Sequence, residues 1–146
     1  MTIFTIGFTK KSAQTFFELI KSNGIKTLVD IRLNNSSQLA GFSKGCDLEY
    51  FLNEICKCGY IYEAIFAPTK ELMDNYKSKK MTPKQFEAAY LELMEERNAL
   101  SYFDKQYANA DNICLLCSED TAELCHRRVL AEMFVSKYPQ TIIKHI

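Results

Sequence analysis

Short apolar runs alternate along this chain with longer segments in which apolar residues recur at helical spacing. The short runs are too short for helices and predict buried strands. They cover residues 3–6, 27–31, 60–65, 113–117 and 141–146. The longer segments predict helices that begin at polar capping residues. These helices run from Ser12 to Asn23 and Gly24, from Asp47 to Gly59, from Thr82 to about Phe103, and from Asp120 or Thr121 to about Lys137.

Capping signals support two of these helices. Thr82 can cap the third helix, Pro83 suits its first position, and Gln85 can complete a capping box. Glu123 is placed to support a cap at Asp120 in the same way. Residues 33–46 show no apolar period and predict a long irregular connection, a kind of loop that often carries function.

The alternation of strands and helices predicts an α/β fold: a single domain over residues 1–146, with a mostly parallel sheet of about five strands and helices on both faces. Ligands of such open sheets bind beyond the carboxyl ends of the strands. We therefore expect the functional edge to carry residues 7–9, Asp30 to Arg32, and Cys117 to Glu119.

Composition and charge narrow the class of protein. In 146 residues, 47% of them apolar, 18 basic and 18 acidic side chains cancel, so no overall field attracts nucleic acid or an anionic membrane. Neither a leader nor a membrane span is recognisable, and we expect a cytoplasmic protein without membrane contact. The six cysteines are then expected to be reduced thiols. The lysines from 77 to 84 are interleaved with Ser, Met and Thr and predict a solvated face.

Unusual polar chemistry gathers where the strand at 113–117 ends. Cys117 and Glu119 close that strand, and Cys125, His126 and Arg127 follow within one short segment. None of these side chains is needed to build a core, so their combination predicts a polar site. Cys117 would lie before a helix N-terminus, where a thiolate is favoured and can act as a nucleophile. The alternative is that Cys117 is a small apolar filler at the end of a buried strand.

His126 and the arginines also admit two interpretations each. His126 can be a general base or thiolate partner, or a core histidine on the apolar face of its helix. Arg127 and Arg128 diverge around a helix, so one of them is predicted to face solvent. Arg32 and the inward arginine can hold a carboxylate or phosphate. Alternatively, Arg32 forms a fixed ion pair with Asp30 or Glu119.

Zinc is suggested by the spacing of Cys114 and Cys117 but is opposed by geometry. Residues three apart on a strand point to opposite faces of the sheet, so these two thiols cannot converge on one ion. Cys56 and Cys58 diverge similarly on a helix. The sequence therefore predicts neither a metal site nor a cofactor.

Five elements, in order along almost the whole chain, resemble the domain of unknown function 488 (DUF488) family. They are Thr5-Ile6-Gly7-Phe8-Thr9, Val29-Asp30-Ile31-Arg32, Ser37-Gln38-Leu39-Ala40-Gly41-Phe42, Leu115-Leu116-Cys117-Ser118-Glu119 and Cys125-His126-Arg127. The resemblance implies a small α/β domain whose motif positions are Asp30, Arg32, Cys117, Glu119, Cys125, His126 and Arg127. It implies no activity. Many members have His at the position of Phe8 and Pro near Asn35, so a mechanism that uses that first histidine does not transfer here.

A weaker likeness is to rhodanese-type sulfurtransferases, in which an Asp-x-Arg strand end also meets a cysteine-bearing loop. Residues 118–124 contain no glycine and three carboxylates, which oppose the charge of a persulfide or phosphate.

The sequence thus predicts an enzyme-like pocket for a small anionic ligand, with nucleotide-derived compounds as candidates. Arg32 and Arg127 would hold the anion together with Asp30 and Cys125, Cys117 would be the nucleophile, and Glu119 and His126 would move protons. The alternatives are a non-catalytic module for nucleic acid, which the net charge does not indicate, or for a protein partner; a rhodanese-like sulfurtransferase; and an inert packing network.

Overall fold

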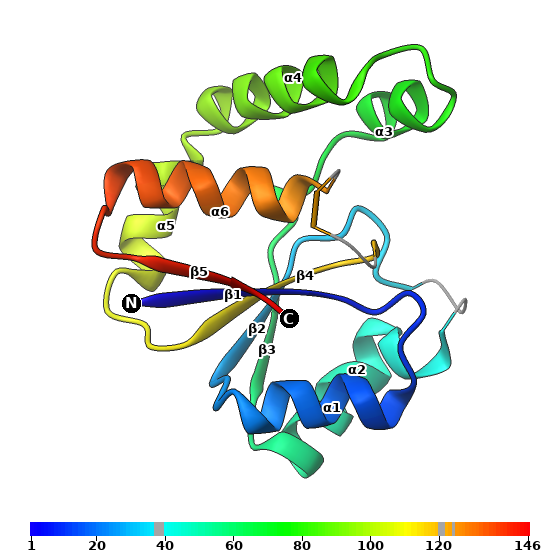
Figure 1. Cartoon of the computed structure of the whole chain (residues 1–146), viewed down its shortest axis with the longest axis vertical. Helices are drawn as coiled ribbons and strands as arrows, with labels where there is room; N and C mark the ends of the chain where they lie inside the picture. The colour runs from blue at the N-terminus through cyan, green and yellow to red at the C-terminus, as the bar shows by residue number, and fades with distance from the viewer. Residues whose placement is uncertain (37–39, 120–121, 124) are drawn as a thin grey trace.

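A sheet of five parallel strands runs through the centre of the protein (Figure 1). The computed structural model describes residues 1–36, 40–119, 122–123 and 125–146. The strands are β1 (Thr2–Gly7), β2 (Thr27–Asp30), β3 (Gly59–Tyr62), β4 (Ile113–Cys117) and β5 (Ile142–His145). Their order across the sheet is β3-β2-β4-β1-β5. The predicted α/β fold with a parallel sheet is confirmed.

Helices cover both faces of this sheet (Figure 1). They are α1 (Ala13–Ser22), α2 (Gly45–Phe51), α3 (Lys70–Lys77), α4 (Pro83–Glu96), α5 (Ala99–Tyr107) and α6 (His126–Lys137). Helices α1 and α2 pack on one face, and α4, α5 and α6 form the core on the other. The predicted capping box is present, because Thr82 accepts from the Gln85 backbone and the Gln85 side chain accepts from the Thr82 backbone.

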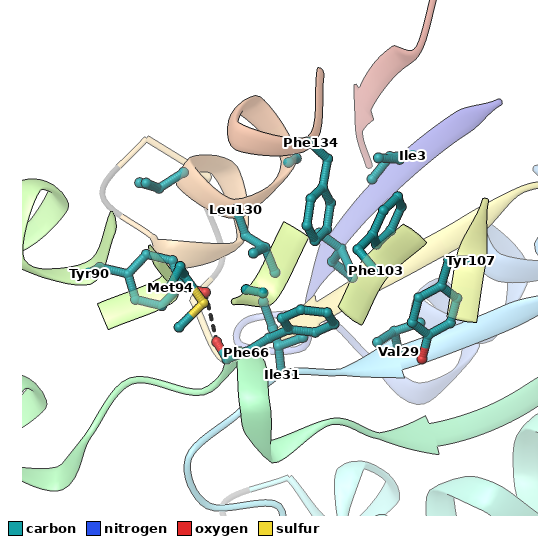
Figure 2. Packing of buried hydrophobic residues seen from close by; sticks show 14 of the residues in the cluster. Ile3, Val29, Ile31, Phe66, Tyr90, Met94, Phe103, Tyr107, Leu130 and Phe134 are labelled. Atoms are coloured by element: carbon teal, nitrogen blue, oxygen red, sulfur yellow. Dashed lines mark hydrogen bonds between the residues drawn. The ribbon is translucent and has the colours of Figure 1, made fainter. Parts of the chain in front are cut away.

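Alternate strand residues supply two separate cores. Val29 and Leu115 point toward α4, α5 and α6, whereas Leu28 and Leu116 point toward α1 and α2. This alternation follows from the two-residue period of a strand and explains why the middle strand, β4, is apolar and buried at every position. Figure 2 shows the first core, where the Tyr90 hydroxyl on α4 donates a 2.7 Å hydrogen bond to the carbonyl of Phe66.

The prediction of one long helix from Thr82 to about Phe103 is wrong, because the segment forms two helices, α4 and α5. Asn98 takes a left-handed backbone conformation with φ of 53° and separates α4 from α5. Asparagine tolerates this conformation better than most residues, so it can turn the chain here. The Arg97 guanidinium holds the turn by donating to the carbonyls of Ile65 at 2.9 Å and Ala67 at 2.6 Å.

Other boundaries also differ from the prediction. Helix α2 begins at Gly45 instead of Asp47 and passes into a π-helix over Leu52–Cys56. Strand β3 ends at Tyr62, and a 3-10 turn over Ala64–Phe66 follows. Helix α3 was not predicted, since the segment is polar on average and only one of its residues is buried. Helix α6 begins at His126, later than predicted, and the expected caps at Asp120 and Thr121 lie outside the described residues.

No helix within the described ranges has both the length and the apolar character that a bilayer crossing requires.

Candidate functional site

The carboxyl ends of the central strands open into a cavity of about 440 Å³. Gly7 of β1 pairs with Cys117 of β4, and Asp30 of β2 pairs with Leu116, so three strands end side by side at this edge. Segments after these strands, together with α3, α4 and the start of α6, form the walls. The lining residues are Phe8, Thr9, Arg32, Leu33, Asn34, Pro68, Met73, Tyr76, Lys77, Phe86, Cys117, Ser118, Glu119, Cys125 and His126.

Two thiols and an imidazole meet at the cavity wall. The Cys125 thiol donates to the Cys117 sulfur across 2.8 Å, and the Cys117 sulfur lies 3.7 Å from Nδ1 of His126. All three side chains are buried to at least 95% yet border the cavity. Cys117 is held by the end of β4, Cys125 is the N-cap residue of α6, and His126 is the first residue of that helix. The structure therefore brings together three residues that lie up to nine positions apart.

The orientation of His126 is set by its other ring nitrogen. Nε2 lies 3.0 Å from the carbonyl oxygen of Ile31, and a carbonyl can only accept, so Nε2 carries a proton. Nδ1 is thereby left to share a proton with Cys117. The ring also packs against Tyr90, with centroids 5.4 Å apart. His126 is thus both a core residue and the partner of a thiol, which unites the two interpretations drawn from the sequence.

This arrangement favours a thiolate on Cys117. Burial raises the pKa of Cys117, but the hydrogen bond from Cys125, the charge and hydrogen bond of His126, and the Glu119 backbone N–H together bring that pKa well below its ordinary value. Burial lowers the pKa of His126, but the Cys117 thiolate and the Ile31 carbonyl outweigh it and the net shift is upward. Burial and the neighbouring Cys117 both raise the pKa of Cys125. These opposite shifts favour a thiolate on Cys117 and a neutral thiol on Cys125.

Arg127 holds the loop that follows β4. Its guanidinium donates to the Thr5 hydroxyl at 3.3 Å and to the backbone carbonyl of Glu119, and it lies 3.9 Å from the Cys125 sulfur. Gly7 allows this loop to cross β1, because a Cβ at Gly7 would lie 1.6 Å from the Glu119 oxygen. Arg127 is buried behind the cavity and is not among its lining residues. Its predicted direct contact with a ligand stays a prediction.

Asp30 and Arg32 form a buried ion pair beside the cavity. The Asp30 carboxylate accepts from Nε and NH2 of Arg32 at 2.9 and 2.7 Å, and from the Tyr60 hydroxyl at 2.6 Å. Arg32 NH2 also donates to the Ser43 carbonyl, while the NH1 nitrogen is buried and lacks a hydrogen-bond partner among the described residues. The guanidinium lies over the Phe8 ring at 5.3 Å. The fixed ion pair expected as an alternative therefore exists, and Arg32 still borders the cavity.

The remaining predicted residues are placed less centrally. Asp30 lies beneath Arg32 and does not line the cavity, and the Glu119 side chain is exposed at its rim. Arg128 points outward, as one of the two arginines was predicted to, and forms ion pairs with Glu87 at 2.8 Å and Glu132 at 2.7 Å.

Part of the cavity wall was missed by the sequence reasoning. Tyr76 and Lys77 of α3 and Phe86 of α4 line it, with the Tyr76 and Phe86 rings stacked at 4.4 Å. Lys77 is exposed, as predicted for a solvated lysine, but the sequence did not show that it also lines the cavity. A sequence signal for α3, which carries Tyr76 and Lys77, was available in the capping residue Thr69. Its side chain accepts a hydrogen bond from the Leu72 backbone at 3.1 Å.

A metal ion has three available ligands here. The donor atoms of Cys117, Cys125 and His126 lie within 4.8 Å of one another. Two thiolates on a tetrahedral zinc, with bonds of about 2.3 Å, stand roughly 3.8 Å apart, so the sulfurs at 2.8 Å would have to separate. Cys114 belongs to the opposite face of the sheet, as predicted, and cannot supply a fourth ligand. A zinc ion would therefore require these two sulfurs to move apart and a fourth ligand from another source.

Comparisons with known proteins identify a family. A family model described as "Domain of unknown function DUF488" matches residues 12–134, most of the 146-residue chain. Comparisons with curated proteins and with solved structures gave no significant match. The matched range contains the strand end at Asp30 and Arg32 and the whole cluster from Cys117 to Arg127. The chain therefore belongs to the DUF488 family.

Proposed function

We propose that the cavity binds a small anionic ligand and that Cys117 attacks this ligand as a thiolate nucleophile. The observation that carries the proposal is the Cys117–His126 pair at the cavity wall, in which a thiol 3.7 Å from Nδ1 faces a ring whose other nitrogen is fixed by a carbonyl. A nucleophile, a base and a group that orients the base are the components of a thiol-based catalytic site.

The cavity walls support an anionic and partly planar ligand. Lys77 and Arg32 are cationic, and the Phe8, Tyr76 and Phe86 rings supply flat apolar surface. Because Asp30 offsets the charge of Arg32, Lys77 contributes more of the attraction in this proposal. A volume of about 440 Å³ falls in the range of small-molecule sites. Nucleotide-derived compounds have the required combination of a ring and an anionic group.

The other motif residues have supporting roles. His126 holds the proton that Cys117 gives up and returns one to the leaving group. The Glu119 backbone N–H stabilises the thiolate, and the exposed carboxylate of Glu119 exchanges protons with water at the rim. Arg127 fixes the loop between Gly7 and Cys125, so it acts here through position rather than through direct contact with the ligand.

Paired alkylating reagents test this proposal. Iodoacetate and iodoacetamide differ mainly by one negative charge, and an ordinary thiolate reacts faster with the neutral reagent because like charges repel. At Cys117 we expect iodoacetate to gain at least severalfold relative to iodoacetamide, compared with the exposed Cys46 of the same chain as internal reference. The rates at each thiol are read by peptide mass spectrometry.

Two variants sharpen the result. Lys77→Met should remove most of the preference for iodoacetate, while Lys105→Met, on the exposed part of α5 away from the cavity, should leave it unchanged. If the ratio of the iodoacetate rate to the iodoacetamide rate is the same at Cys117 and Cys46, the proposal of an anion-binding cavity is refuted. Salt-sensitive binding of an oligonucleotide that is unaffected by alkylation of Cys117 would favour a recognition module instead.

A further inference from the structure

We propose that Cys125 is the resolving thiol of a Cys117–Cys125 pair, and that the cavity takes small anionic disulfides as substrates for thiol–disulfide exchange. This inference rests on the proposed function, since Cys117 must attack first, and it specifies the substrate class. It starts from the two sulfurs that face each other at 2.8 Å beside the cavity.

The two sulfurs already lie close to the distance of a disulfide bond. A disulfide brings its sulfurs to about 2.05 Å, so the existing separation of 2.8 Å requires only a small side-chain adjustment. One sulfur belongs to the last residue of β4 and the other to the N-cap of α6, and Arg127 contacts the connecting loop and the Cys125 sulfur together. The pair is thus held in contact by the fold.

The other cysteines are placed for no comparable reaction. Cys58 and Cys114 are buried in the core under α1 and α2, and burial raises the pKa of Cys58 to about 12. Cys46 is exposed and Cys56 is half-buried. Of the six cysteines, therefore, Cys117 and Cys125 form the thiol pair that borders the cavity.

The first step uses the charge asymmetry of the pair. The Cys117 thiolate attacks one sulfur of a substrate disulfide and forms a bond with it. The substrate S–S bond breaks, and the other half leaves as a thiol with the proton that Nδ1 of His126 had taken from Cys117. During this step Cys125 remains a neutral thiol, because burial and the charge on Cys117 disfavour its ionisation. The protein then carries a mixed disulfide on Cys117.

The first step prepares the second. Once Cys117 is in a mixed disulfide its negative charge is gone, so one of the causes that kept Cys125 protonated disappears. The Arg127 guanidinium at 3.9 Å then favours the Cys125 thiolate. The His126 ring, which has passed its first proton to the departing half, offers a nitrogen within 4.8 Å that can take the Cys125 proton. Cys125 attacks the Cys117 sulfur, the mixed disulfide breaks, and the second substrate half leaves as a thiol with the proton that His126 took from Cys125.

The balance is complete without a further reactant. Each substrate disulfide gains two electrons and becomes two thiols, and Cys117 and Cys125 lose two electrons and become one disulfide. Excess small thiol drives the same exchange backward and restores the pair.

Dithiobis(nitrobenzoate), an aromatic disulfide dianion with a coloured thiolate product, is a suitable probe. We use the full chain with Cys46→Ser and Cys56→Ser, which removes the accessible thiols outside the cavity. We expect two equivalents of nitrothiobenzoate per chain, no adduct on the protein, and a Cys117–Cys125 disulfide in the peptide map. Adding Cys125→Ser should stop the reaction after one equivalent and leave an adduct on Cys117.

Different outcomes would overturn the resolving role of Cys125 and the nucleophilic role of Cys117. One equivalent released and a persistent adduct on the chain that retains both thiols would overturn the resolving role while leaving the nucleophile intact. A slow reaction at Cys117 would overturn both proposals. Stoichiometric zinc that protects both thiols and is lost on Cys125→Ser would identify a metal site and also overturn the inference. The peptide map of the unsubstituted pair decides the question even where Cys125→Ser lowers stability.

Discussion

Asp30→Asn should destabilise the protein strongly, because it removes the charge from an ion pair whose side chains are 0% and 2% exposed. The carboxylate accepts from the Arg32 backbone at 3.1 Å, from the guanidinium at 2.9 and 2.7 Å, and from Tyr60 at 2.6 Å. An asparagine keeps one acceptor oxygen and turns an NH₂ group toward donors. Breaking a buried pair on one side costs about 3–5 kcal/mol in the free energy of unfolding.

The loss can be measured by urea unfolding followed by circular dichroism. A cost of that size corresponds to a fall in Tm of about 10–15 °C for a domain of this length. Asp111→Asn, at an exposed loop position, is the matched control and should change the free energy of unfolding by less than about 0.5 kcal/mol. A loss below about 1 kcal/mol for Asp30→Asn would refute the reasoning, since the pair would then be open to water.

A double substitution tests the cause of the loss. Asp30→Asn with Arg32→Met removes both charged partners, so neither is left buried alone. We expect the double variant to be more stable than the sum of the two single losses predicts, by at least about 1 kcal/mol. Additive losses would mean that packing, and not the uncompensated guanidinium, determines the cost.

Two further predictions concern the loop and the thiol. Gly7→Ala should lower the free energy of unfolding by about 1–3 kcal/mol and slow the alkylation of Cys117, because the Glu119 backbone must move to accept the new Cβ. Gly41→Ala is the control, because a Cβ added there meets nothing within 4 Å. The rate of alkylation of Cys117 by iodoacetamide should level off at lower pH than that of free N-acetylcysteine, since only the thiolate reacts and its pKa is lowered. Coincident pH profiles would contradict the proposed pair with His126.

Much of the fold was predictable because it depends on local rules. The apolar run at 113–117 is strand β4 with the predicted boundaries, and the cap at Thr82 starts α4 as expected. Strands and helices that alternate along the chain favour the α/β class of fold, so a parallel sheet could be predicted. Asn98 was not recognised as a break because a left-handed residue between two helices leaves the apolar period almost unchanged.

The sequence by itself determined which chemical groups gather at the carboxyl edge, since strand ends are visible as the ends of apolar runs. Only the tertiary structure decided how these groups are paired. It places Arg127 behind the cavity, joins Arg32 to Asp30, and brings the Cys125 thiol to 2.8 Å from Cys117. The physical reason is that these distances depend on the path of a loop across β1 and on the packing of α6, and contacts between distant segments leave no local pattern in the chain.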